Sequence, residues 1–217
     1  MLTEDEKNIV DPDIVDYLEQ LVGDSPDPAS EMEREAEKRS FPIVGPQVGR
    51  FLALVSAMIR PGRIVELGSG FGYSAFWLGL GAPRAEIHLT EYKASNLEQA
   101  RKYLNRTNHP ERFVYHEGDA LESVQDIRGP VECILLDLDK EEYPRALDWV
   151  EERLAPGGTL IADNVLWKGK VTFSGPSETA TDAVKTFNKR LHEKPWSSSI
   201  LPIRDGLAIA RMEGPFP

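Results

Sequence analysis

Five short β-rich runs alternate with helical patterns between residues 63 and 162, and this alternation restricts the fold more than any other feature of the chain. The β-rich runs cover residues 63–67, 86–89, 113–116, 132–136 and 159–162. The helical patterns between them cover residues 73–80, 94–105, 119–125 and 141–153. Because each helical segment is long enough for one right-handed crossover, this order predicts a parallel sheet with helices on its faces.

Three helices are predicted before the alternating region. The first begins at Pro12, which takes the first helical position after Asp11 as the N-cap. Ser30 and Glu33 form a capping-box pattern, which predicts that a second helix begins at Ser30. A third helix is expected from Gly45-Pro46 to the Pro61-Gly62 break.

The last 40 residues depart from the alternation. After a helical pattern at 178–191, the strand-like runs 197–201 and 207–211 are separated by only five residues, which predicts an antiparallel hairpin. A doubly wound, Rossmann-like sheet that is mostly parallel and ends in such a hairpin is the layout of class I methyltransferases, an α/β fold. We expect a single domain over residues 1–217, with a helical extension at 1–40 and a cofactor-binding and catalytic core at 41–217.

Composition and charge exclude several classes of protein. Lys and Arg number 25 and Asp and Glu number 36, and the resulting net charge of −11 repels phosphate backbones and anionic headgroups. The most apolar stretch, residues 51–59, is far shorter than the roughly 18 residues that a membrane helix needs. The opening MLTEDEKNIV lacks the pattern of a secretion signal, and the single Cys133 excludes an internal disulfide. We expect a cytoplasmic protein that binds neither membranes nor nucleic acid.

A glycine-rich turn follows the first β-rich run. A dinucleotide site needs a small residue where this chain has Tyr73, and it places pyrophosphate near the strand end, where Glu66 would repel it. S-adenosylmethionine carries no phosphate but has a cationic amino group and a sulfonium, so an acid beside close glycine backbone suits it. The spacing favours this cofactor over a nicotinamide dinucleotide. Its candidate contacts in the turn are Glu66, Gly68, Ser69, Gly70, Tyr73 and Ser74.

Acidic residues also follow the next two β-rich runs. Glu91 lies 23 residues after Gly68, near the distance at which an acid accepts both ribose hydroxyls of a nucleoside. Asp119 and Ala120 follow the third run, where a side chain or backbone amide can contact adenine. Taken singly, the glycine turn is compatible with a plain tight loop, Glu91 with a solvated acid and Asp119 with a helix N-cap. Their shared position at strand ends favours the cofactor site.

Hard oxygen ligands follow the fourth and fifth runs. Asp137 directly follows the fourth run, and Asp163-Asn164 directly follows the fifth. Neighbouring parallel strands would bring these side chains together. Such ligands select Mg²⁺ or a similar cation over zinc. The alternative is that Asp163-Asn164 caps a helix and Asp137 binds only the cofactor. Lys140 would lie at a helix start, and a neighbouring cation would lower the pKa of its amine, which makes it a candidate general base.

Three motifs together resemble the cation-dependent O-methyltransferases, the family of catechol and caffeoyl-CoA O-methyltransferases. They are VELGSGFGYSA, LLDLDKEEY and ADNVLWKGKV, and the resemblance extends from about Val44 to the C-terminus. It implies cofactor contacts at Val44, Glu66, Gly68, Ser74, Glu91, Ala120 and Asp139. It further implies that Asp137, Asp163 and Asn164 hold the metal, that Lys140 is the base, and that Lys168 lies at the acceptor. Trp167 is a candidate to line an aromatic acceptor pocket, with core packing as the alternative.

The resemblance implies methyl transfer from S-adenosylmethionine, with a divalent cation such as Mg²⁺, to a small molecule with vicinal aromatic hydroxyls. Related small enzymes use their N-terminal helices to cover the site or to form a dimer, so a homodimer is expected. Three alternatives remain from the sequence. They are a hydroxyuridine O-methyltransferase acting on tRNA, an NAD-dependent oxidoreductase, and a catalytically silent cofactor-binding module.

Overall fold

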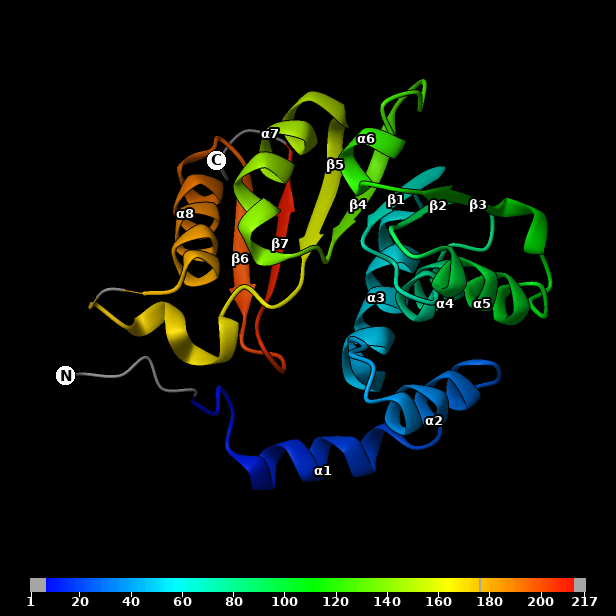
Figure 1. Cartoon of the computed structure of the whole chain (residues 1–217), viewed down its shortest axis with the longest axis horizontal. Helices are drawn as coiled ribbons and strands as arrows, with labels where there is room; N and C mark the ends of the chain where they lie inside the picture. Colours follow the sequence, from blue (N-terminus) through cyan, green and yellow to red (C-terminus); the bar gives the residue numbers. More distant parts are fainter. Residues whose placement is uncertain (1–6, 176, 213–217) are drawn as a thin grey trace. The chain divides into compact units, whose positions relative to one another are not determined.

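The computed structural model describes residues 7–175 and 177–212, and Figure 1 shows its helices and strands. The strands follow the order β3-β2-β1 in one part of the chain and β4-β5-β7-β6 in the other. The chain divides into two compact units, one formed by Val15–Gly129 and the other by Met1–Ile14 together with Pro130–Pro217. Residues 1–6, where the acidic opening segment begins, lie outside the described residues.

The unit formed by Val15–Gly129 contains three parallel strands. They are β1 (Arg63–Leu67), β2 (Glu86–Glu91) and β3 (Phe113–Glu117), with β2 between the other two. Its helices are α2 (Ala29–Arg39), α3 (Gly45–Ile59), α4 (Tyr73–Gly81), α5 (Ala94–Leu104), the 3-10 turn η1 (Pro110–Arg112) and α6 (Ala120–Ser123). Because parallel strands end at the same edge of a sheet, the glycine-rich turn, Glu91 and Asp119 all lie at that edge.

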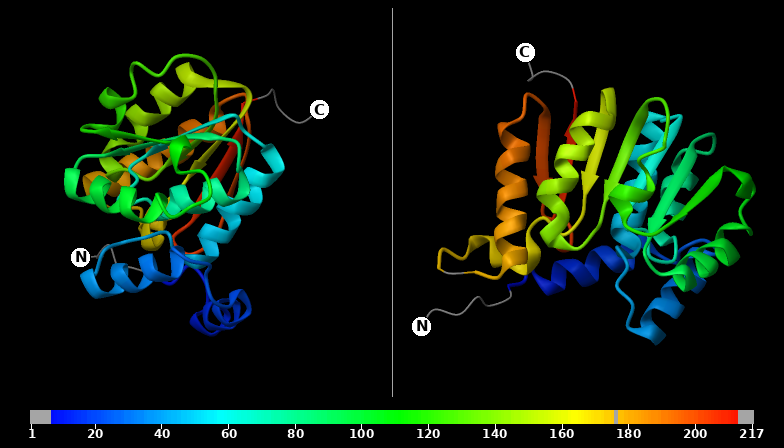
Figure 2. Two further views of the ribbon diagram at one scale, coloured as in Figure 1. Left: turned by 90° about the vertical axis from the view of Figure 1, so that its right-hand side faces the viewer. Right: turned by 45° about the horizontal axis from the view of Figure 1, so that its top comes forward.

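The second unit contains a parallel strand pair extended by an antiparallel hairpin. Its strands are β4 (Val131–Leu136), β5 (Leu154–Ala162), β6 (Ser197–Leu201) and β7 (Leu207–Arg211). β4 pairs in parallel with β5, and β7 lies antiparallel between β5 and β6. The helical segments are the 3-10 turn η2 (Lys140–Glu142), α7 (Tyr143–Arg153), the 3-10 segment η3 (Trp167–Thr172) and α8 (Thr179–Glu193). α7 and α8 pack side by side against these strands (Figure 2).

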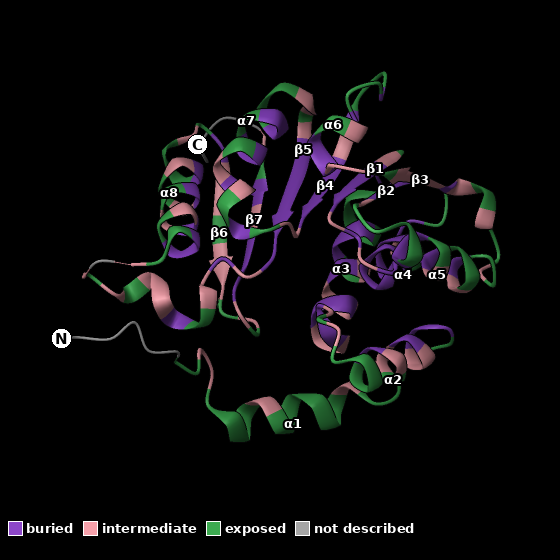
Figure 3. Cartoon of the chain, in the orientation of Figure 1, coloured by how far each residue is buried: buried purple, intermediate pink, exposed green. Residues whose placement is uncertain are grey.

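Burial follows the apolar patterns of the strands and crossover helices. β4 reads VECILL, and five of its six residues are buried, as expected for a strand covered on both faces. α4 is buried from Tyr73 to Gly79, which matches its apolar sequence on all sides. Figure 3 shows buried strands in the centre of each unit and an exposed α1 (Pro12–Val22).

Most predicted elements are confirmed, and the differences lie at their ends. β5 begins at Leu154, five residues before the predicted run, because Leu154 pairs with Val131 ahead of an irregularity in the β4–β5 register. α6 ends at Ser123 and not at residue 125. The Ser30 capping box is wrong: α2 begins at Ala29 with Pro28 as its N-cap, so Ser30 already lies within the helix and its hydroxyl bonds Asp27. Over the described ranges, no helix has the length and apolar character required to cross a bilayer.

Candidate active site

The glycine-rich turn in the Val15–Gly129 unit has the backbone shape of a close ligand approach. Gly68 and Gly70 adopt φ values of +90° and +51°, a region that favours glycine over other residues. A Cβ on Gly70 would lie 2.9 Å from the Phe41 ring, so this turn also passes tightly against the segment before α3. The turn therefore brings bare backbone to the end of β1.

Hydrogen bonds join this turn to the end of β2. The Gly68 amide donates to Thr90 Oγ1 at 3.0 Å, and the Thr90 hydroxyl donates to the Glu66 carbonyl at 3.0 Å. Glu66 is fully buried, and the Ser74 hydroxyl donates to its carboxylate. An acid buried at a strand end beside close glycine backbone suits the cationic amino end of S-adenosylmethionine, so these residues fit the predicted cofactor.

The acids at the end of β2 and directly after β3 both accept local hydrogen bonds. Glu91 Oε1 accepts from the Lys93 amide at 2.8 Å and from Asn96 Nδ2 at 3.1 Å, which orients the carboxylate beside the start of α5. Asp119 Oδ1 accepts from two amides of α6, both at 3.0 Å, so it is the N-cap of that helix. The predicted N-cap role of Asp119 is thus confirmed. Ala120, the first residue of α6, is buried.

Two further predicted cofactor residues lie around the start of α3 and α4. Val44 is buried at the N-cap of α3. Tyr73 is buried at the start of α4, where its ring meets Trp77 edge-on and its hydroxyl donates to Glu33 of α2. Burial and the Glu33 carboxylate raise the pKa of Tyr73, which keeps the hydroxyl protonated. The Tyr73 side chain therefore contributes to packing against α2.

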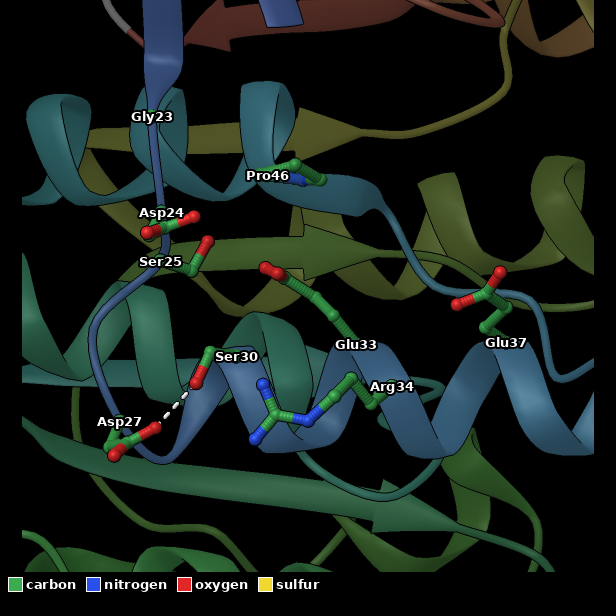
Figure 4. A pocket seen from close by; sticks show the side chains of 9 residues that line it. All are labelled: Gly23, Asp24, Ser25, Asp27, Ser30, Glu33, Arg34, Glu37 and Pro46. Atoms are coloured by element: carbon green, nitrogen blue, oxygen red, sulfur yellow. Dashed lines mark hydrogen bonds between the residues drawn. The ribbon is translucent and has the colours of Figure 1, made fainter. Parts of the chain in front are cut away.

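A cavity of about 620 Å³ lies beside α2 in the same unit (Figure 4). Four carboxylates and one guanidinium line it, and none of the predicted cofactor residues is among its lining. The lining residues are Gly23, Asp24, Ser25, Asp27, Ser30, Glu33, Arg34, Glu37 and Pro46. The excess of carboxylates disfavours anionic ligands in this cavity.

Asp137 and Asp163, in the second unit, follow adjacent strands. Leu136 and Ala162 are register partners in the parallel pair of β4 and β5, and the Asp163 amide donates to the Leu136 carbonyl at 3.0 Å. Asp163 is 4% exposed, and burial followed by repulsion from Asp137 raises the pKa of Asp163 to about 7. The register confirms that β4 and β5 are neighbours, so Asp137 and Asp163 follow adjacent strand ends.

A bound cation would remove this repulsion. Asp163 Oδ1 accepts from the Asn164 amide at 2.8 Å, and Asn164 adopts φ +57°, a backbone region that asparagine tolerates better than most residues. In the described parts of the chain, no three His, Cys, Asp or Glu side chains are grouped as metal ligands. The predicted set has two carboxylates and one amide, all hard oxygens, and fits Mg²⁺ in donor chemistry.

Lys140 is buried beside these aspartates with all of its donors engaged. Its Nζ donates to Asp137 Oδ1 at 3.1 Å, to the Leu138 carbonyl at 3.0 Å and to the Tyr143 hydroxyl at 2.8 Å. Its Nζ also lies 4.6 Å from the Tyr143 ring centroid and 5.9 Å from that of Trp167. Asp139, the residue before Lys140, is exposed.

The predicted acceptor residues Trp167 and Lys168 lie on η3, which is held from two sides. Both residues have positive φ, 47° and 52°. The Lys168 amide donates to the carboxylate of Asp205, and the Lys168 carbonyl accepts from the Lys7 amide at 2.7 Å. Burial raises the pKa of Asp205. This strained segment thus depends on the β6–β7 connection and on the N-terminal segment.

Sequence reasoning missed three residues of this cluster. Tyr143 is the last residue of the LLDLDKEEY motif. Its spacing from Lys140 is the signal that could identify it from the sequence. Asp205 lies in the predicted hairpin connection. Its Asp-Gly pair is typical of such a turn, so the local sequence does not mark it as part of the site. Lys7 has no distinguishing local pattern.

Comparisons with known proteins identify the family of the chain. The O-methyltransferase family model matches residues 17–213. A catechol O-methyltransferase from Mycobacterium tuberculosis is 30% identical over 179 residues, which cover 81% of this chain and 81% of that protein. A catechol O-methyltransferase from Niastella koreensis is 28% identical over 182 residues, which cover 81% of this chain and 82% of that protein.

The fold also matches that of solved structures. An O-methyltransferase from Bacillus cereus, determined in complex with SAH, superposes with a TM-score of 0.83 over 93% of this chain and 97% of that chain, at 23% identity. The extent of the family match also decides against the NAD-dependent oxidoreductase alternative. The chain therefore belongs to the O-methyltransferase family and is an S-adenosylmethionine-dependent O-methyltransferase.

Proposed function

We propose that this enzyme methylates a hydroxyl of a catechol-like small molecule with the help of a divalent cation. The observation that carries the proposal is the placement of Asp137 and Asp163 directly after the paired strands β4 and β5, whose last residues Leu136 and Ala162 are register partners. Two carboxyl groups that repel each other, one of them buried, form a site that a cation would stabilise. The names of the two catechol O-methyltransferases support the acceptor class.

Asp137, Asp163 and Asn164 would hold the cation. When bound, it would act as a Lewis acid that lowers the pKa of an acceptor hydroxyl and orients the two vicinal oxygens. The Asn164 amide donates a hydrogen bond that orients Asp163 Oδ1, and Lys140 Nζ does the same for Asp137 Oδ1. These hydrogen bonds preorganise the ligand set before an acceptor binds.

Lys140 would take the proton of the acceptor hydroxyl. A phenol has a pKa near 10, so at neutral pH it is a poor nucleophile until its proton is removed. The Lys140 side chain is buried and contacts Asp137, so it lies at the proposed cation ligands. General base catalysis of this kind contributes roughly 10²- to 10⁴-fold to the rate.

The glycine-rich turn and its acids would bind S-adenosylmethionine, which supplies an electrophilic methyl group on a sulfonium. Glu66 suits the amino end, and Glu91 suits the ribose hydroxyls. The remaining proposed cofactor residues are Val44, Gly68, Ser69, Gly70, Tyr73, Ser74, Asp119, Ala120, Asp137 and Asp139. Trp167 and Lys168 would contact the acceptor from η3.

We also infer that the enzyme forms a homodimer. No residue of α1 is buried, and its apolar side chains Ile14, Tyr17 and Leu21 are 51%, 59% and 64% exposed. An apolar helix face of this kind is usually covered by a partner. Light scattering of the purified chain tests this, and a mass near the monomer value of 24.3 kDa would overturn it.

The function is tested by transfer of labelled methyl from S-adenosylmethionine to caffeate and 3,4-dihydroxybenzoate, with Mg²⁺ and with EDTA. Transfer that EDTA abolishes is the expected result. The Asp137→Ala variant should lose more than about 100-fold in kcat, while cofactor binding by calorimetry stays largely intact because the other proposed cofactor residues remain. Glu141→Ala, an exposed acid nearby, is the matched control and should retain activity.

Two outcomes would contradict the proposal. Metal-dependent transfer by Asp137→Ala at the wild-type rate would remove the cation assignment. Transfer to tRNA but to neither catechol would replace the acceptor class with a hydroxylated uridine.

A further inference from the structure

The connection between β6 and β7 lies along the segment that carries the predicted acceptor residues. The Asp205 carbonyl accepts from the Leu166 amide at 2.9 Å, and the Gly206 carbonyl accepts from the Val165 amide at 3.0 Å. The Asp205 carboxylate accepts from the Lys168 amide. A Cβ on Gly206 would lie 2.4 Å from Leu166 Cγ, so the two segments are in close contact. The residue before Asp205 is therefore held beside this part of the site.

That residue is Arg204, and its backbone conformation is unusual for an arginine. It adopts φ +48°, in a region that glycine and asparagine occupy more readily than other residues. Arg60, the C-cap of α3, is also exposed and has φ +49°, so a positive φ by itself does not mark a functional arginine. What distinguishes Arg204 from Arg60 is its place next to the acceptor segment.

Positive charges gather at this place, although the whole chain has a net charge of −11. The charges of Lys140 and Arg204 both act on the Asp163 carboxyl group, where they oppose the effect of burial on its pKa. The charges of Lys140, Lys168 and Arg204 act in the same way on the pKa of Asp205. Lys140 is buried, whereas Lys168 and Arg204 are exposed. Of these three cations, Lys168 and Arg204 are therefore the ones that a ligand can reach from solvent.

We propose that Arg204 is a specificity-determining residue that selects acceptors carrying an anionic group, such as a carboxylate, in addition to their two vicinal hydroxyls. The inference rests on the proposed function, in which those hydroxyls are held near Asp163. A guanidinium is always charged in proteins, and its planar fork of N–H donors matches the geometry of a carboxylate. Lys168 supplies a second positive charge from η3.

The alternative is that Arg204 only compensates the charge of the neighbouring carboxyl groups. In that case the loss of its charge would disturb the cation site and the β6–β7 connection, and transfer to every acceptor would slow by the same factor. Selection of an anionic group predicts instead an effect that is confined to charged acceptors. Two acceptors that differ in charge but hardly in shape therefore separate these roles.

The experiment compares 3,4-dihydroxybenzoate with the neutral 3,4-dihydroxybenzamide at saturating Mg²⁺ and S-adenosylmethionine. Arg204→Asn removes the charge and places at this position a residue that tolerates positive φ. It should lower kcat/KM for the benzoate by about 5- to 20-fold, mainly through KM, as expected for a partly exposed charge-assisted hydrogen bond. The value for the benzamide should stay within about twofold. Arg60→Asn makes the same change at the exposed arginine of α3 and is the matched control, which should change neither value.

Three further measurements separate recognition of charge from a general loss of fit. Arg204→Lys keeps the charge without the fork of donors, so it should lose less activity toward the benzoate than Arg204→Asn. Added salt should raise the benzoate KM more steeply in wild type than in Arg204→Asn, because salt screens exposed charges. Calorimetry of benzoate binding with Mg²⁺ and S-adenosylhomocysteine should show affinity about 5- to 20-fold weaker in Arg204→Asn.

The contrary outcomes distinguish the inference from the proposed function. Equal losses for the benzoate and the benzamide in Arg204→Asn would show the compensating role and overturn the inference. Unchanged kcat/KM for both acceptors, or an equal effect of Arg60→Asn, would also overturn it while leaving the proposed function intact. Absence of EDTA-sensitive transfer to either acceptor by the wild-type enzyme would instead remove the proposed function, and the inference with it.

Discussion

Burial, together with the neighbouring Asp137 carboxyl group, raises the pKa of Asp163 at the ends of two adjacent strands. Asp163 is nearly inaccessible to water, whereas the Asp137 side chain is 30% exposed, so the cost of ionisation falls mainly on Asp163. Lys140 and Arg204 oppose the shift but do not cancel it. The metal-free enzyme therefore holds a carboxyl group that ionises only near neutral pH.

This relationship predicts how the stability of the metal-free enzyme depends on pH. The pKa of Asp163 is raised from 3.8 to about 7, so between these values the folded state keeps a proton that the unfolded state has lost. Stability in EDTA should therefore fall as pH rises from about 4 to about 7, because folding then requires proton uptake. Thermal melting of Asp163→Asn should show a shallower slope in this window, with Glu152→Gln as the exposed control. Parallel slopes for wild type and Asp163→Asn would contradict this.

A second pH dependence, of opposite sign, is expected from the histidine pair on β2 and β3. His88 Nδ1 lies 2.8 Å from His116 Nε2, and burial lowers the pKa of both residues from 6.5, with His116 adding to the effect on His88 and Glu86 opposing it. Below about pH 6.5 the unfolded chain binds protons that folded His88 does not, so stability falls as pH decreases. Urea unfolding at pH 7.5 and 5.5 should show a smaller loss for His88→Leu than for wild type. The prediction fails if the two proteins lose equal stability.

Close packing of α3 on α4 predicts a large effect of one added methyl group. A Cβ on Gly81 would lie 2.0 Å from the Ala53 carbonyl oxygen and 2.2 Å from Ser56 Oγ, and backbone at that distance cannot move without shifting α3. We expect Gly81→Ala to cost about 1–3 kcal/mol of unfolding free energy. On the same helix, a Cβ at Gly79 meets the end of the Arg112 side chain, at 2.6 Å, and its nearest contacts include no backbone atom, so Gly79→Ala should cost less. Denaturant unfolding tests the pair, and equal losses would refute the argument.

The N-terminal segment should affect acceptor binding through η3. Lys7 Nζ donates to Thr172 Oγ1 at 2.8 Å, at the end of the segment that carries Lys168. Removing this hydrogen bond in Lys7→Ala should raise the acceptor KM about threefold, with kcat and cofactor affinity unchanged, because such bonds contribute about 1 kcal/mol or less. Lys38→Ala on α2 is the control for loss of an exposed positive charge. Initial rates across acceptor concentrations decide, and an unchanged KM would rule out this coupling.

Local patterns in the chain were enough to predict most of the fold. The β-rich runs 63–67 and 132–136 coincide with β1 and β4 to within one residue, because alternation and apolar runs are properties of neighbouring residues. Asp137 and Asp163-Asn164 were placed together by the rule that parallel strands end at one edge, and the pairing of β4 with β5 agrees. The start of α2 was missed because Ser30 bonds Asp27 and does not cap the helix.

Contacts between residues far apart in the chain could not be predicted in this way. Tyr143 and the Asp163 carbonyl are 20 positions apart, Lys168 and Asp205 are 37 apart, and Lys7 and Thr172 are 165 apart. No periodicity relates such residues, because their distance depends on how strands and helices pack after each has formed. The amino-acid order alone therefore specifies the strand-end acids and the glycine-rich turn, whereas the folded chain decides which side chains orient Lys140 and which hold η3.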